Sequence, residues 1–286
     1  DLHLSIRRQR QMCIRDSSIT ELCFEASDER LLLTENTQPA ILTVSVALHR
    51  ILEARGLVPN WVAGHSLGEY SALVAAGALD VATAARLVHN RGIYMQQAVP
   101  EGAGAMAAVL GLERVEIETL CARCGSDLIV EVANVNAPGQ VVVSGNTEAV
   151  HQLISMSKEA GARRAILLNV SAPFHCSLMQ PAAERLARDL VEVEFEDPRF
   201  PVVCNVTATS IATGEAARLA LEQQVTQPVL WSDTLEFLSA QGVEVFVEVG
   251  PGRVLSGLVK RTLGRGVGIY AVDEIEEIEA VLAALG

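Results

Sequence analysis

The sequence predicts an α/β protein in which helices cover both faces of a mostly parallel β-sheet. Short apolar strands alternate with helices over most of the chain, and this alternation is typical of parallel sheets. A second observation is a strand–helix–strand–strand–helix–strand order over residues 103–170, which indicates a smaller sheet of its own. The length of 286 residues is sufficient for one large domain with a smaller one inserted into it.

The first part of the core is predicted from residue 18 onward. Residues 1–17 show no helical or strand periodicity, and we expect them to be a leader that is foreign to the fold. Apolar side chains at helical spacing end at Gly56, a short apolar strand runs directly into Gly64, and Asp80 is expected to cap a helix. These patterns predict a strand at 60–63 and helices at 38–54, 67–78 and 81–98.

The insert is predicted from its order of elements. Strands are expected at 105–110, 128–135, 140–144 and 164–170, and helices at 113–124 and 147–160. This βαββαβ order is that of the ferredoxin-like split motif. The core would then consist of residues 18–102 and 171–286, with residues 103–170 as the inserted subdomain.

The second part of the core returns to strands that alternate with helices. Helices are expected at 179–190, 215–224, 231–241 and from the Pro251-Gly252 turn to about 263. Strands are expected at 202–206 and 243–249, the second of which is almost wholly apolar.

Charge and hydropathy exclude two classes of function. The formal net charge is −13, and an acidic chain is a poor nucleic-acid binder by its overall field. The longest stretch without a charged side chain, 165–183, contains Asn169, Pro173 and His175 and therefore cannot be a lipid-facing helix.

The six cysteines are interpreted as reduced thiols of a cytoplasmic protein, because no secretory signal opens the chain and its size needs no disulfides. Cys121 and Cys124 form one CxxC pair with no second pair at zinc spacing. We therefore predict no metal site.

The sequence Gly64-His65-Ser66-Leu67-Gly68 is a G-x-S-x-G motif between a predicted strand and a predicted helix. In this context it indicates a nucleophile elbow, in which Ser66 is lifted to the carboxyl end of the sheet. The tight turn is expected to leave no room for a side chain at either glycine. The N–H of Leu67 would then stabilise an oxyanion. The alternative is a glycine-rich turn that only packs a helix on a sheet.

Arg91 and His175 are the other candidates for chemistry. Arg91 lies on the apolar stripe of its predicted helix, and a buried guanidinium needs a partner such as a carboxylate; a structural ion pair or an arginine that reaches solvent at the helix end is the alternative. His175 remains as the base for Ser66 by elimination. The other histidines lie in the leader, on predicted helices, or beside the serine and turned away from it: His3, His49, His65, His89 and His151.

With these residues in place, the chain resembles the malonyl-CoA:acyl-carrier-protein transacylases, the family that loads the carrier protein in bacterial type II fatty acid synthesis. Gly64-His-Ser-Leu-Gly-Glu-Tyr70 is similar to the family signature. The other matching stretches are Asn36-Thr-Gln-Pro-Ala-Ile-Leu42, Arg91-Gly-Ile-Tyr-Met-Gln96, Ala133-Asn-Val-Asn-Ala-Pro-Gly-Gln140, Ser171-Ala-Pro-Phe-His-Cys-Ser-Leu-Met179, Gln227-Pro-Val-Leu-Trp231 and Glu248-Val-Gly-Pro-Gly252.

The resemblance implies a role for each matching residue. Ser66 is the nucleophile, His175 its base, and the main-chain carbonyl of Gln224 orients that histidine. Arg91 binds the malonyl carboxylate, and the Leu67 N–H is an oxyanion donor. The positions that line or support the site are Gln38, His65, Asn134, Asn136 and Phe174.

The resemblance also implies the fold and the reaction. The expected fold is an α/β-hydrolase-like core with a ferredoxin-like insert. The expected reaction is a ping-pong transfer of malonyl from malonyl-CoA to acyl carrier protein, with CoA as the first product and no cofactor. We expect a monomer that binds neither nucleic acid nor membrane.

The amino-terminal residues depart from the family. The family begins with a strand and a Phe-Pro-Gly-Gln-Gly-Ser-Gln turn, whose first glutamine supplies the second oxyanion N–H, and residues 1–35 do not match it. We therefore expect the first core strand to be missing and the activity of this chain to be impaired. The alternatives are a serine esterase or thioesterase of the α/β-hydrolase type and an inactive fold kept for binding.

Overall fold

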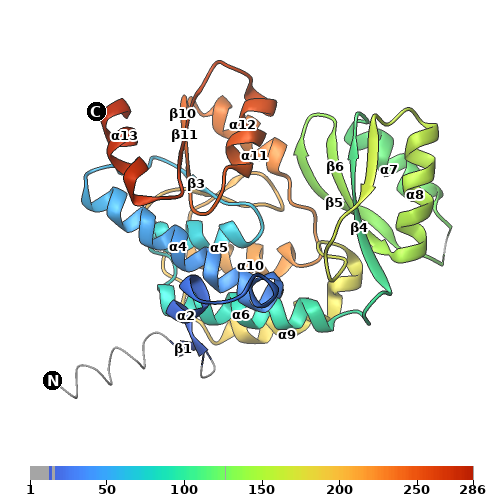
Figure 1. Cartoon of the computed structure of the whole chain (residues 1–286), viewed down its shortest axis with the longest axis horizontal. Helices are drawn as coiled ribbons and strands as arrows, with labels where there is room; N and C mark the ends of the chain where they lie inside the picture. Colours follow the sequence, from blue (N-terminus) through green and yellow to red (C-terminus); the bar gives the residue numbers. More distant parts are fainter. Residues whose placement is uncertain (1–12, 15–16, 126, 286) are drawn as a thin grey trace.

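The computed structural model describes residues 13–14, 17–125 and 127–285. In this part of the chain a large helical and sheet region lies beside a smaller sheet (Figure 1). We call the large region the core and the smaller sheet, with its two helices, the small unit. An α/β protein is therefore confirmed.

Most β-strands of the core lie in two short sheets, each of which contains one parallel pair. β3 (Val62–Ala63) pairs in parallel with β8 (Val202–Val203), which pairs with the antiparallel β9 (Ser210–Ile211). β10 (Val245–Val249) pairs in parallel with β11 (Gly268–Val272). A two-residue hairpin, β1 (Cys13–Ile14) with β2 (Ser17–Ser18), precedes them in the chain.

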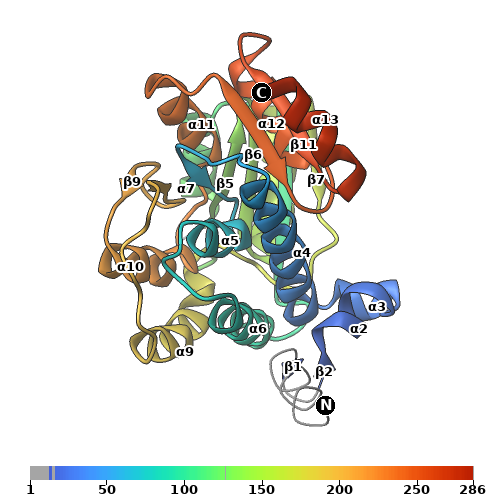
Figure 2. The same cartoon turned by 90° about the vertical axis from the view of Figure 1, so that its left-hand side faces the viewer.

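Helices surround these strands. α5, the first helix after β3 in the chain, lies beside α4 and above α6 in Figure 2. The helices of the core are α2 (Ile19–Phe24), α3 (Asp28–Leu32), α4 (Thr34–Ala54), α5 (Leu67–Ala75), α6 (Val81–Gln97), α9 (Gln180–Val191), α10 (Gly214–Gln224), α11 (Trp231–Ala240), α12 (Val254–Leu263) and α13 (Ile275–Leu285). A short 3₁₀ helix, η1 (Ser177–Met179), leads into α9.

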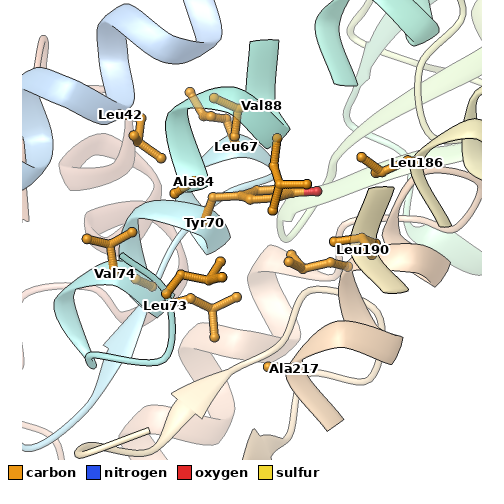
Figure 3. Close-up of a cluster of buried hydrophobic side chains, with 14 of the residues drawn as sticks. Leu42, Leu67, Tyr70, Leu73, Val74, Ala84, Val88, Leu186, Leu190 and Ala217 are labelled. Atoms are coloured by element: carbon orange, nitrogen blue, oxygen red, sulfur yellow. The ribbon is translucent and has the colours of Figure 1, made fainter. Parts of the chain in front are cut away.

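The largest buried cluster of the core joins α4, α5, α6, α9 and α10. Figure 3 shows Tyr70 at its centre, with Leu73 from the same helix, Val88 from α6 and Leu190 from α9 around it. All four side chains are fully buried. Burial of this apolar surface is the main source of stability for the helices that carry the candidate site.

α6 forms as predicted. Asp80 caps it by accepting hydrogen bonds from the N–H groups of Ala82 and Thr83, both at 3.0 Å. Arg91 lies on its buried stripe with an exposed fraction of 2%. The predicted burial of this cation is therefore confirmed.

The small unit contains β4 (Gly104–Leu110), α7 (Arg114–Arg123), β5 (Val130–Ala137), β6 (Gln140–Asn146), α8 (Thr147–Glu159) and β7 (Arg164–Leu167). Its strands form one antiparallel sheet in the order β5-β6-β4-β7. α7 and α8 cover the outer face (Figure 1) and bury a separate apolar cluster that includes Ile117, Val143 and Leu153.

Two backbone hydrogen bonds join the small unit to the core. The N–H of Val135 donates to the carbonyl of Val229, and the N–H of Val229 donates to the carbonyl of Ala133, both at 2.9 Å. Val229 lies between α10 and α11, so β5 is tied to the segment that follows Gln224.

Several elements differ from the prediction. The expected strands at 60–63, 164–170 and 202–206 are shorter, and the helix expected from residue 38 begins at Thr34. β11 and α13 were not predicted, nor were α2, α3 and β9. Most of the predicted leader, 1–17, lies outside the described residues. Among the residues that the structure describes, no helix is long and apolar enough to span a membrane.

The turn between β3 and α5 depends on one of its two glycines. A Cβ on Gly64 would lie 2.0 Å from the backbone of Gly68, which is far inside van der Waals contact. A Cβ on Gly68 would meet nothing within 4 Å. The expectation that neither glycine has room for a side chain is therefore correct for Gly64 and wrong for Gly68, because the side chain of Gly68 would point away from the turn.

We predict that Gly64→Ala destabilises the chain by more than about 1 kcal/mol, because the backbone of the turn must move to admit the methyl group. Gly68→Ala is the matched control and should change the free energy of unfolding by less than about 0.5 kcal/mol. Urea unfolding followed by circular dichroism measures both. Equal effects of the two substitutions would contradict this account of the turn.

Candidate active site

Ser66 occupies a strained turn at the start of α5. Its φ of 52° and ψ of −103° are rare for a residue with a side chain, and such strain is typical of functional sites. The side chain of Asn205, two residues after the end of β8, holds this turn. Its Oδ1 accepts from the Ser66 N–H at 2.6 Å, and its Nδ2 donates to the Gly64 carbonyl at 2.7 Å.

Ser66, His175 and Gln224 form one chain of hydrogen bonds. The Ser66 Oγ lies 2.8 Å from Nε2 of His175, and Nδ1 of His175 lies 2.9 Å from the main-chain carbonyl of Gln224. A carbonyl only accepts, so Nδ1 carries the proton and Nε2 is free to accept one from Ser66. This is the arrangement of a nucleophile with its base.

His175 is held in its neutral form. Burial, with the nearby charge of Arg91 acting in the same direction, lowers the pKa of its imidazole to about 3. The residue also has a positive φ of 59°. A neutral imidazole at physiological pH is ready to take a proton.

Arg91 brings a buried positive charge to the same oxygen. Its NH2 group donates to the Ser66 Oγ at 2.9 Å and to Oε1 of Gln224 at 2.9 Å. Its NH1 group donates to Oε1 of Gln38 at 2.7 Å. Within the described residues, no carboxylate lies within 4.0 Å of this guanidinium, because none of the ion pairs includes it.

Neutral amide oxygens thus position this cation and leave its charge uncompensated by a direct ion pair. Burial lowers the pKa of Arg91, and the ring of Tyr70 lies 5.7 Å from its guanidinium carbon. Burying a charge of this kind costs free energy unless a partner of opposite charge pairs with it. The predicted alternatives, a structural ion pair or an arginine that reaches solvent, are wrong for the described residues.

Glu69 lies below the site on α5, one helical turn after Ser66, and is fully buried. Its Oε2 accepts from Nε2 of Gln224 at 2.6 Å and from the N–H of Asn205 at 3.1 Å. Its Oε1 has no hydrogen-bond partner in the described part of the chain. Burial raises the pKa of Glu69 to about 7, although its hydrogen bonds and Arg91 act in the opposite direction.

The remaining predicted residues lie around this group at different distances. The Leu67 N–H is the first of α5, where a helix N–H has no intrahelical partner. His65 turns away from Ser66, as expected, and its Nε2 lies 2.8 Å from Oδ1 of Asn136. The ring of His65 also lies 5.6 Å from that of Trp231.

Asn134 and Phe174 lie on the side of the small unit. Asn134 is buried in β5, where its backbone bridges to Val229. Phe174 is half-buried beside Met106 and Val142 of the small sheet, directly before His175. The structure therefore brings Ser66, His175, Gln224, Arg91 and Gln38 into direct contact and places His65, Asn134, Asn136 and Phe174 outside that hydrogen-bonded group.

Sequence reasoning missed two residues of the site, Glu69 and Asn205. The position of Glu69 was available as a signal, because it lies three residues after Ser66 on an otherwise apolar helix face. Asn205 follows an apolar strand, and the carboxyl ends of adjacent parallel strands meet at one sheet edge. Predicting its contact with Ser66 would have required knowing that β8 pairs with β3.

The site contains groups suited to acyl transfer rather than to metal binding. No group of three or more metal-ligating side chains gathers in the portion of the chain that the structure describes. A serine with a neutral base can form an ester, and the adjacent cation, which makes no direct ion pair among the described residues, fits a substrate that carries its own carboxylate.

Comparison with known proteins agrees with this chemistry. Residues 7–281 match the acyl transferase domain family. The malonyl CoA-acyl carrier protein transacylase of Escherichia coli K12 is 48% identical over 258 residues, which are 90% of this chain and 82% of that protein. The corresponding Bacillus subtilis (strain 168) protein is 42% identical over 271 residues, or 94% of this chain and 85% of that protein.

Solved structures give the same result. The malonyl CoA-acyl carrier protein transacylase of Coxiella burnetii superposes with a TM-score of 0.91 at 43% identity, covering 94% of this chain and 85% of that one. A type II polyketide synthase acyl-carrier protein in complex with its malonyl-transacylase matches with a TM-score of 0.90 at 45% identity, covering 93% and 86%. The chain therefore belongs to the acyltransferase family that includes the malonyl CoA-acyl carrier protein transacylases.

Proposed function

We propose that this chain transfers the malonyl group of malonyl-CoA to the phosphopantetheine thiol of acyl carrier protein through a malonyl ester on Ser66. One observation supports a malonyl group as the acyl group that is transferred. The buried guanidinium of Arg91 lies 2.9 Å from the Ser66 Oγ and has no carboxylate partner among the described residues. A malonyl thioester supplies that carboxylate next to the carbonyl that Ser66 attacks.

The first half-reaction acylates the serine. Nε2 of His175 takes the proton of the Ser66 hydroxyl as the oxygen attacks the thioester carbonyl, and the Leu67 N–H stabilises the oxyanion. The carbon–sulfur bond then breaks. The proton on His175 passes to the departing CoA sulfur, and the malonyl ester of Ser66 remains.

The second half-reaction reverses these roles. His175 takes the proton of the carrier protein's thiol, the thiolate attacks the ester, and the proton returns to Ser66 as its oxygen leaves. A related malonyl-transacylase forms a complex with an acyl-carrier protein, which supports a carrier protein as the acceptor here. No cofactor takes part in these steps.

The geometry does not favour the esterase alternative. A serine esterase of the α/β-hydrolase type orients its histidine with a carboxylate, whereas His175 is oriented by the main-chain carbonyl of Gln224. The cation of Arg91 would also have no partner in a neutral ester.

We further infer the finer organisation of the fold. The strand order of the small unit and its separate apolar cluster support a ferredoxin-like insert over residues 103–170 in an α/β-hydrolase-like core. The cytoplasmic location and the monomeric state expected from the sequence stay predictions.

We also infer that a strand position of the core sheet, between β3 and β10, is not supplied by the described residues. Ala63 of β3 and Phe246 of β10 belong to one apolar cluster, so the two sheet pieces are neighbours. Yet β3 pairs only with β8, and β10 only with β11, in the described part of the chain. Parallel strands are usually paired and covered on both sides, but Val245 is 43% exposed.

We predict that purified chain incubated with malonyl-CoA acquires one malonyl adduct on the peptide that contains Ser66. Added acyl carrier protein should remove the adduct and become malonylated itself. Intact-mass and peptide mass spectrometry measure both steps, and Ser66→Ala is the control that should show neither. A chain that hydrolyses p-nitrophenyl acetate rapidly but never carries the adduct would be an esterase instead.

The neutral state of His175 predicts a pH dependence of stability. The folded imidazole, with a pKa of about 3, takes up no proton between pH 7 and 5, whereas in the unfolded chain it titrates near its ordinary value of 6.5. Acidification therefore favours the unfolded state. Relative to His175→Asn, the wild-type chain should lose about 2 kcal/mol of stability between pH 7.5 and pH 5.

Urea unfolding of both proteins at the two pH values measures this difference. All other titrating groups are shared, so their contributions largely cancel. A difference between the two proteins that stays constant with pH would mean that folded His175 binds a proton in this range.

The unpaired edge of β10 predicts a pattern of hydrogen exchange. The Gly250 N–H donates to the carbonyl of Val272, and strand alternation turns the N–H groups of Val247 and Val249 to the opposite edge. We expect these two amides to exchange at least about 10-fold faster than those of Glu248 and Gly250. Equal protection, measured by NMR, would show that another segment pairs with this edge.

A further inference from the structure

The side-chain amide of Gln224 links the parts of the candidate site. Its Oε1 accepts from Arg91 at 2.9 Å, and its Nε2 donates to the main-chain carbonyl of Ser66 at 3.0 Å and to Oε2 of Glu69 at 2.6 Å. The amide is fully buried. It therefore touches the cation, the nucleophile's backbone and a buried carboxylate at once.

The orientation of this amide decides whether it can hold the arginine. A side-chain amide has a donor end and an acceptor end, and a rotation of 180° exchanges them. In the rotated state the NH₂ group of Gln224 would face the guanidinium of Arg91, donor against donor. Arg91 would lose one of its acceptors inside the protein, where an unpaired buried donor is costly.

Glu69 and the main-chain carbonyl of Ser66 select the orientation that is observed, because both accept from the Gln224 NH₂ group, Glu69 at the shorter distance. Oε2 of Glu69 has no hydrogen to donate and therefore requires a donor from Gln224. The same oxygen accepts from the backbone N–H of Asn205 at 3.1 Å, which fixes the carboxyl group in turn. Oε1 has no partner among the described residues, so a proton there would leave the contact with Gln224 unchanged.

We propose that Glu69 is a positioning residue for substrate selection: by accepting from Gln224 it holds the Gln224 amide oxygen against Arg91 and so fixes the guanidinium where a substrate carboxylate must bind. The inference rests on the proposed function, because the readout is the preference for a malonyl over an acetyl group. Glu69 itself touches neither substrate nor Ser66 Oγ; it acts through Gln224.

The test compares Ser66 acylation by malonyl-CoA and by acetyl-CoA, which lacks the carboxylate, in single-turnover mass spectrometry. Glu69→Leu removes the closer of the two acceptors of the Gln224 NH₂ group at similar volume, and it should lower the ratio of the malonyl rate to the acetyl rate by about 10-fold to 100-fold. Glu69→Gln keeps an oxygen that can accept from Gln224, and the ratio should stay within about 3-fold of wild type.

Three further variants separate positioning from loss of structure. Gln224→Met removes the amide but keeps the main-chain carbonyl that orients His175, and it should lower the ratio as Glu69→Leu does. In an Arg91→Met background, Glu69→Leu should change the malonyl rate by less than about 3-fold, because the group through which it acts is gone. Glu248→Leu is the matched control: it removes a carboxylate that accepts from the N–H groups of Leu255 and Ser256 rather than from a residue of the site, and the ratio should not change.

The outcomes separate a failure of the proposed function from a failure of the role proposed for Glu69. A wild-type chain that never forms a malonyl ester contradicts the proposed function. A wild-type chain that prefers malonyl, together with Glu69→Leu and Gln224→Met variants that slow both acyl groups equally, overturns the role of Glu69 alone. Additive effects of Glu69→Leu and Arg91→Met, or a Glu69→Gln ratio as low as that of Glu69→Leu, would overturn it as well.

Discussion

The buried charge of Arg91 is the constraint on which the rest of the site depends. Moving a guanidinium out of water costs several kcal/mol even after the protein relaxes, and an ion pair is the usual compensation. Here Gln38, Gln224 and the Ser66 hydroxyl supply oxygens without supplying a negative charge. These oxygens fix the position of the guanidinium but leave it able to pair with a carboxylate. Recognition of a malonyl group requires both.

This constraint explains why so many polar groups are buried beneath Ser66. Each acceptor of Arg91 needs its own support: Gln38 donates to Thr34, and Gln224 donates to Glu69. The apolar cluster around Tyr70 lies next to these groups, with the Tyr70 ring 5.7 Å from the guanidinium carbon of Arg91. Hydrogen bonds in such surroundings are strong when they are complete and costly when they are not, so the network tolerates few alternative arrangements.

The sequence predicted those parts of the site whose signal is local. Ser66 was identified by a short motif between a strand and a helix, and Arg91 by its place on an apolar helix face. The contacts of Gln38 and Gln224 with Arg91 have no local signal in the sequence. Only the resemblance to the family pointed to these two residues. Asn205 was not found because its role arises from the pairing of β3 with β8, which are far apart in the chain. β11 was missed for a different reason: a short apolar run carries no periodicity that separates a strand from a helix. α13 does show helical spacing, with apolar residues at Ile275, Ile278, Val281 and Leu285, but no element was assigned to that part of the sequence.

The connection between β5 and Val229 has a mechanical consequence. Val229 follows Gln224 by five residues, and Gln224 supplies the carbonyl that aligns the imidazole of His175. A hinge motion that swung the β4–β7 sheet away from the helices would strain the same segment that keeps the imidazole aligned. The mouth of the site therefore cannot widen by this movement without disturbing the alignment of the base.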